Sequence, residues 1–116
     1  MNDFMYCKLE IFIPESHFNL LAVTLQQMDA GHIGQYDSCL SFSKVVGRWR
    51  PMQDANPYIG QINEVSTEEE IKVEVVCLTE SVEKTLDAII KIHPYEMPLI
   101  NVIPLYSTSL MYRHIG

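Results

Sequence analysis

The hydrophobic pattern at the start of the chain predicts a strand followed by a helix. Between residues 5 and 13, apolar side chains fill alternate positions, with Lys8 and Glu10 between them, as in a half-buried strand. Beyond Pro14, apolar side chains recur at helical spacing until Gly31, a typical helix terminator. The apolar positions are Cys7, Leu9, Ile11 and Ile13 in the strand, and Phe18, Leu21, Ala22, Leu25 and Met28 in the helix.

The middle of the chain predicts two more strands joined by a loop. Residues 35–51 are strand-like but irregular, and Gly47 is typical of a β-bulge. Residues 52–60 are rich in turn-forming residues. Strict alternation returns at residues 71–77, and we interpret the acidic residues 68–70 as a solvated entrance to that strand.

A second helix and a last strand meet at a corner framed by two prolines. The helix begins at Thr79 and runs into the segment His93-Pro94-Tyr95-Glu96-Met97-Pro98. Pro94 has no amide hydrogen and disfavours helical dihedral angles at the residue before it, so the helix should end there. Residues 99–105 are almost continuously apolar, as in a strand that is covered on both faces or packed at a subunit contact. The tail, residues 106–116, is compatible with an extra edge strand or an arm onto a neighbouring subunit.

The order strand, helix, strand, strand, helix, strand predicts a single α+β domain over residues 1–116. It is the ferredoxin-like split βαβ (βαββαβ) arrangement, an antiparallel sheet with two helices on one face. The other face needs cover, and we expect its apolar surface to come from four aromatic residues and to lead to oligomerisation. They are Tyr6, Tyr36, Phe42 and Trp49.

Composition limits which kinds of partner and which cellular compartment are expected for this chain. The formal net charge of −7 argues against binding to a nucleic-acid backbone, which requires a positive surface. The three cysteines form no Cys-x-x-Cys pair, which favours buried thiols in a reducing compartment. Neither a signal-peptide pattern nor an apolar run of the ~20 residues that cross a membrane is present. These features predict a cytoplasmic protein without a membrane partner.

Several motifs resemble one known domain. They are Gly31-His32-Ile33-Gly34-Gln35-Tyr36, then Cys39 and Phe42, then Asn56-Pro57-Tyr58-Ile59-Gly60, and finally His93-Pro94-Tyr95-Glu96. In this order they resemble the PII/CutA-like domain found within many bacterial members of the Nif-three-like family and also as free-standing small proteins. The resemblance covers roughly residues 8–105. Asp29 and Met97 depart from the family's usual glycine and second acidic residue.

The resemblance also implies an assembly and a type of site. CutA and PII proteins are ferredoxin-like trimers that bind small ligands or ions in clefts between subunits. It therefore implies a homotrimer with a small molecule or cation at the subunit interface. The dinuclear metal site of full-length Nif-three-like proteins lies in regions outside this resemblance, so its chemistry is not implied.

Five residues form the predicted ligand site: His32, Tyr36, His93, Tyr95 and Glu96. Three of them, His32, His93 and Glu96, are of metal-ligand type and could hold a divalent metal ion. We expect the two helices to end toward the same edge of the sheet, which would bring the two histidines to one end of the molecule, within a subunit or across a seam. The alternative is that both histidines only bond the backbone at tight corners.

The sequence contains no nucleophile–base arrangement and no phosphate-binding loop, so it predicts a protein that is not an enzyme. The main hypothesis is a non-catalytic regulatory module that binds a small ligand or a cation. A metal-assisted hydrolase built on His32, His93 and Glu96, and a purely structural oligomerisation domain, are the alternatives.

Overall fold

A computed structural model describes residues 3–112 as a four-stranded sheet with two helices. Short 3₁₀ turns precede both helices, and a third follows the last strand. The strands are β1 (Tyr6–Ile13), β2 (Ser41–Trp49), β3 (Ser66–Leu78) and β4 (Ile100–Leu105), and the helices are α1 (Phe18–Gln27) and α2 (Val82–Ile92).

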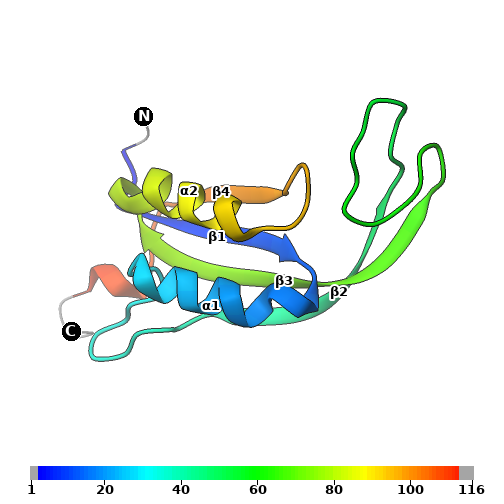
Figure 1. The fold of residues 1–116 in the computed structure, drawn as a ribbon. Coiled ribbons are helices and arrows are strands. Elements are labelled where there is room, and N and C mark those ends of the chain that lie inside the picture. Colours follow the sequence, from blue (N-terminus) through cyan, green and yellow to red (C-terminus); the bar gives the residue numbers. More distant parts are fainter. Residues whose placement is uncertain (1–2, 113–116) are drawn as a thin grey trace.

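The sheet has the order β2-β3-β1-β4, and every neighbouring pair is antiparallel. Both helices lie on one face of the sheet and run in opposite directions (Figure 1). The ribbon formed by β2 and β3 extends beyond the helices at one end of the molecule, where residues 50–65 form a long loop (Figure 1). This arrangement confirms the predicted α+β, ferredoxin-like fold.

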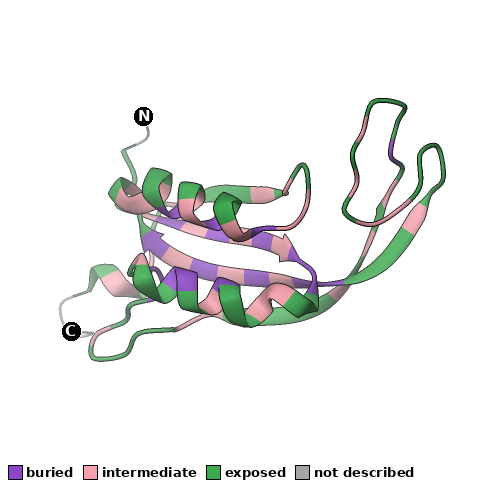
Figure 2. Cartoon of the chain, viewed as in Figure 1, coloured by how far each residue is buried: buried purple, intermediate pink, exposed green. Residues whose placement is uncertain are grey.

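The core lies between the helices and the two central strands. In β1 and β3, buried side chains alternate with partly exposed ones, as the sequence pattern predicted (Figure 2). The core side chains from the sheet are Cys7, Leu9, Ile11, Ile13, Ile71, Val73, Val75 and Cys77, and the helices add Leu21, Leu25 and Ile89. Burial raises the pKa of the Cys77 thiol to about 11, so it stays protonated at neutral pH.

The expected β-bulge at Gly47 is wrong. The pairing of β2 with β3 continues without interruption from Ser41 opposite Glu74 to Trp49 opposite Ser66. Gly47 instead provides space, because a Cβ at this position would lie 2.4 Å from Oε1 of Glu70. Glu70 is only 7% exposed, so the interpretation of residues 68–70 as wholly solvated fails at its last member.

The face of the sheet that the helices leave open differs from the expected apolar one. Its centre carries an ion-pair network in which Lys8 Nζ lies 2.7 Å from Glu74 Oε1 and 3.5 Å from Glu10 Oε2. Phe42 lies on the helix side, with its ring centroid 4.7 Å from that of Phe18. Tyr36 belongs to an exposed loop. Two of the four predicted aromatic residues are therefore not gathered on this face, whereas Tyr6 and Trp49 keep the register of its outward-facing side chains.

The strand at residues 99–105 is also less enclosed than one covered on both faces. β4 pairs with β1 alone, and most of its side chains are exposed in the single chain. Its role at a subunit contact stays a prediction. The tail, where the structure describes it, contains a 3₁₀ turn (Ser109–Met111), and residues 113–116 lie outside the described part.

None of the helices within residues 3–112 is both long and apolar enough to span a lipid bilayer.

Candidate functional site

The two histidine motifs lie at opposite ends of the sheet, so the expectation that both helices end at one edge is wrong. The amide of Gly31, which follows α1, donates to Val76 O near the end of β3, and Val76 pairs with Lys8 near the start of β1. His93, which ends α2, bonds Phe12 O near the end of β1. These anchor points are about 13 Å apart along β1, because four residues of strand separate them. The reason is topological: α1 and α2 follow antiparallel strands, so their ends point in opposite directions.

His32 belongs to a tight, exposed loop. Its Nδ1 lies 2.8 Å from Asp29 Oδ1 and its Nε2 lies 2.9 Å from Gly34 O. Both partners are acceptors, and the pKa of His32 is raised, first by the hydrogen bond to Asp29 and then by the carbonyl of Gly34. Ile33 and Tyr36 exchange two backbone hydrogen bonds across the turn, so the loop is held by its own residues.

His93 is buried, and both of its ring nitrogens bond the backbone. Its Nδ1 accepts a hydrogen bond from the amide of Tyr95 at 3.1 Å, so its Nε2 carries the proton and donates to Phe12 O at 2.6 Å. Burial lowers the pKa of His93, because it disfavours the charged imidazolium. The hydrogen bond to Phe12 O has the opposite, smaller effect and raises this pKa. With both nitrogens engaged, His93 acts as the backbone-bonding corner residue that the alternative interpretation described.

We expect His32 and His93 to titrate on opposite sides of the usual histidine pKa of 6.5. His93 has the lowered pKa, so its contribution to stability is complete above pH 6.5. It declines as the pH falls below 6.5, because the unfolded chain then binds the proton more readily than the folded chain. Two-dimensional NMR of the imidazole nitrogens, with His32→Ala and His93→Ala for assignment, measures both values. A higher pKa for His93 than for His32 would contradict this account.

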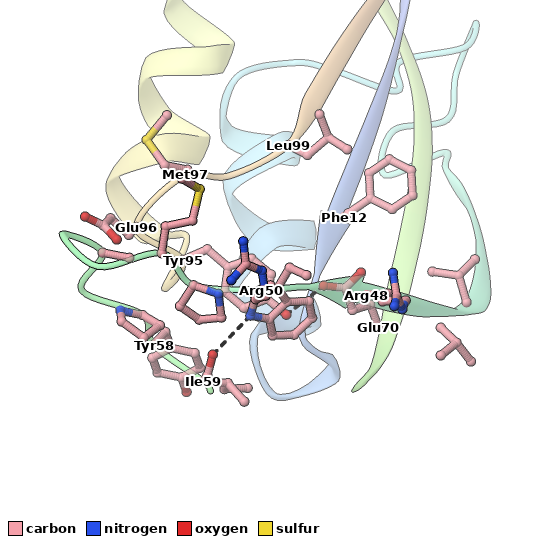
Figure 3. A pocket seen from close by; sticks show the side chains of 18 residues that line it. Phe12, Arg48, Arg50, Tyr58, Ile59, Glu70, Tyr95, Glu96, Met97 and Leu99 are labelled. Carbon is pink, nitrogen blue, oxygen red and sulfur yellow. Dashed lines mark hydrogen bonds between the residues drawn. The ribbon is translucent and has the colours of Figure 1, made fainter. Parts of the chain in front are cut away.

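A cavity of about 630 Å³ lies between the 50–65 loop, the end of the β2–β3 ribbon and the corner after α2 (Figure 3). This volume is within the range typical of small-molecule sites. Two of the five predicted site residues, Tyr95 and Glu96, line the cavity. The ring of His93 contacts that of Tyr95 but does not line the cavity. His32 and Tyr36 belong to the distant His32 loop. The cavity is lined by Phe12, Val45, Val46, Gly47, Arg48, Trp49, Arg50, Pro51, Met52, Ala55, Pro57, Tyr58, Ile59, Glu70, Tyr95, Glu96, Met97 and Leu99.

Three aromatic rings line one part of this cavity. The ring centroid of Tyr95 lies 5.8 Å from that of Trp49 and 6.1 Å from that of Tyr58, with tilted planes. Trp49 Nε1 donates to Ile59 O at 3.2 Å, which fixes the indole against the loop. Because its one polar atom is satisfied in this way, Trp49 presents mainly apolar surface to the cavity.

A carboxylate lies beside these rings. Glu70 Oε2 accepts a hydrogen bond of 2.7 Å from the hydroxyl of Tyr95. Burial, followed by this hydrogen bond, raises the pKa of Tyr95 well above its usual value, so the phenol is a permanent donor. The absence of a side chain at Gly47 leaves room for the other carboxylate oxygen.

Glu96 ties the long loop to the corner. Its Oε1 accepts a hydrogen bond of 2.8 Å from the amide of Asn56. Since Asn56 belongs to the 50–65 loop, this bond fixes the loop across the cavity. Glu96 therefore acts on the shape of the cavity through the loop backbone.

Comparisons with known proteins concern the family and the fold of the chain. The chain is 37% identical over 98 residues to a "GTP cyclohydrolase 1 type 2 homolog" from Halalkalibacterium halodurans, which covers 84% of the chain and 26% of that protein. A Bacillus cereus protein related to NIF3 has a structure that matches 92% of the chain and 27% of its own length, with 25% identity and a TM-score of 0.78. The periplasmic divalent cation tolerance protein CutA from Archaeoglobus fulgidus matches 90% of the chain and 87% of its own length, with 16% identity and a TM-score of 0.67. No family model matches the chain.

The chain is a PII/CutA-like domain related to the Nif-three-like family. It spans about a quarter of the length of the curated relatives it matches. The likeness to CutA, at 16% identity, concerns the fold alone.

Within the described residues of this PII/CutA-like domain, no three histidine, cysteine or acidic side chains gather closely enough to hold a metal ion. His32 is separated from His93 and Glu96 by the length of the sheet, and both nitrogens of His93 are occupied. The predicted metal set is thus not assembled by one copy of the domain.

Sequence reasoning missed the residues that shape the cavity, above all Glu70 and Tyr58. Glu70 is the last of three consecutive acidic residues, and the other two are exposed, so the sequence did not distinguish it from them. The available signal was a glycine in the strand that pairs with this run, because an in-register Gly47 leaves space beside a neighbouring side chain.

Proposed function

We propose that this PII/CutA-like domain is a non-catalytic regulatory module that binds a small ligand in the aromatic cavity. The observation that carries the proposal is the combination of three aromatic rings with the buried carboxylate of Glu70 in one cavity. A mostly apolar cavity with a few fixed polar groups is the usual form of a small-molecule site.

The chemistry of the cavity supports binding over catalysis. The raised pKa of Tyr95 keeps its hydroxyl protonated. Both ring nitrogens of His93 form hydrogen bonds with the backbone. Neither group is a ready base or nucleophile. The name of the curated relatives refers to GTP cyclohydrolase, but the domain corresponds to only about a quarter of them, so their activity need not lie in this segment.

We also propose that the domain assembles as a homotrimer, as the resemblance to CutA and PII proteins implies. Two features support contacts between copies: β2 and β4 each have an unpaired edge, and one sheet face is left open by the helices.

A ligand screen that uses Trp49 as the reporter tests the proposed function. Trp49 is the single tryptophan of the chain and lines the cavity, so its fluorescence responds to occupancy. We expect nucleosides, amino acids or other small metabolites from such a screen to change the emission and to raise the melting temperature. Sedimentation and metal analysis of the same sample test the trimer and the metal-dependent alternative. A screen with no response at Trp49, or a response only to divalent metal ions, would overturn the proposal.

A further inference from the structure

The His32 loop, residues 28–40, joins α1 to β2 in a strained conformation. Asp29 and Ser38 have φ values of 60° and 59°, in the left-handed region that residues with a side chain rarely adopt. Such a conformation persists only where surrounding contacts hold it. The side chain of His32 supplies two of these contacts.

His32 bridges two parts of the loop with its two ring nitrogens. Its Nδ1 lies 2.8 Å from Asp29 Oδ1, and its Nε2 lies 2.9 Å from Gly34 O. An ionised carboxylate and a carbonyl can only accept, so both nitrogens must carry a hydrogen for both bonds to form. A neutral imidazole has one N–H, whereas the imidazolium has two. The bridge is therefore complete only when His32 is protonated, and neither nitrogen is then left for a metal ion.

The surroundings of His32 favour the protonated ring. The hydrogen bond to Asp29, followed by that to Gly34 O, raises the pKa of His32. The charged groups that act on the ring within the described residues are Asp29 and Asp37, and both are acidic. Gln26 and Ser38 donate hydrogen bonds to the carboxylate of Asp37, at 3.4 and 3.1 Å, so this second charge is held in place.

We propose that the His32 loop is a pH-dependent switch, in which the charged ring ties Asp29 to Gly34 and the neutral ring releases Gly34. A neutral ring keeps its bond to the carboxylate, because that bond is stronger than one to a carbonyl. Its Nε2 then has a lone pair that faces the lone pairs of Gly34 O, so these two atoms move apart. This inference concerns the end of the sheet opposite the cavity and does not depend on the proposed function.

Release of Gly34 loosens the turn that presents Ile33 and Tyr36. These two residues exchange backbone hydrogen bonds of 2.7 and 2.9 Å on either side of Gly34 and Gln35. Both side chains are exposed, and Tyr36 is 73% exposed. The bridge is complete below pH 6.5 and is lost as the pH rises through the raised pKa of His32, so this exposed surface changes at pH values above 6.5.

A pH titration of the unaltered chain by NMR, in a buffer that contains EDTA, tests the switch. The protection factor of the Tyr36 amide corrects for the faster intrinsic hydrogen exchange at high pH. We expect it to fall about fivefold with the same midpoint as the His32 ring, because the turn loses one charge-assisted hydrogen bond. The protection of the Val73 and Val75 amides, in β3, should stay constant. A His32 ring that titrates while the protection of Tyr36 stays constant would overturn the switch.

Three variants separate the switch from a general effect of pH. In His32→Gln the side chain does not titrate, so the protection of Tyr36 should no longer depend on pH. His17→Gln, outside the loop, should keep the fivefold change. Asp29→Asn retains a residue that tolerates the left-handed φ, and it should lower the midpoints of the His32 ring and of Tyr36 together. A change at Tyr36 that persists in His32→Gln, or a midpoint that does not follow the ring in Asp29→Asn, would contradict the proposal.

Discussion

We expect Gly31→Ala to lower the free energy of unfolding by about 3 kcal/mol, as the sum of a backbone cost and a steric cost. Gly31 has a φ of +79°, a region that residues with a side chain rarely adopt. A Cβ there would lie 2.4 Å from the backbone oxygen of Cys39, and backbone cannot move aside as a flexible side chain can. The amide of Gly31 also bonds Val76 O, and its carbonyl accepts from the amide of Cys39, so any shift breaks the loop's link to the sheet.

Gly34→Ala is the matched control for that variant. Gly34 has a comparable φ of +57°, but a Cβ added to it meets no close neighbour among the described residues. It should therefore show only the backbone cost, about 1 kcal/mol. Urea denaturation measures both values. Equal losses for the two variants would show that the close approach of Gly31 to Cys39 has no energetic weight.

His93→Ala is expected to destabilise the domain by about 3 kcal/mol, because it removes a buried ring together with its hydrogen bonds to Phe12 and Tyr95. His32→Ala serves as the comparison, since His32 is exposed and bonds only within its own loop. We expect its unfolding midpoint to stay near that of the unaltered chain. Denaturation curves decide between a structural role and a metal-binding role for His93.

The two interpretations of His93 differ in a second readout. A structural His93 predicts that the variant's lost stability is unaffected by divalent metal ions. If His93→Ala instead kept full stability and lost a metal-dependent stabilisation shown by the unaltered chain, the structural assignment of His93 would be wrong.

The sequence was sufficient for the fold because the core obeys simple periodicities. Cys7 to Ile13 and Ile71 to Cys77 alternate without exception, and all eight inward positions are buried. The proline-framed corner also ended α2 as expected: Ile92 is its last residue, and His93 adopts an extended conformation with φ −77° and ψ 130°.

The site could be predicted only in part, because it depends on the path of a long loop. Tyr95 and Glu96 were recognised from their corner, but their partners Glu70 and Asn56 are 25 and 40 residues away in sequence. Pairing the two histidines failed for a different reason, since the antiparallel relation of β1 and β3 sends the helix ends apart. This direction follows from the predicted topology and was available from the sequence.

Chemical-shift mapping by ¹H–¹⁵N NMR tests most directly whether the aromatic cavity is the site. Trp49 gives the single indole N–H signal of the chain, because no other tryptophan is present. On addition of a compound that raises the melting temperature, the account predicts shifts of that signal and of the Asn56 and Tyr95 amides, with Ile33 and Tyr36 unchanged. Shifts confined to the His32 loop, with the Trp49 indole unmoved, would contradict it.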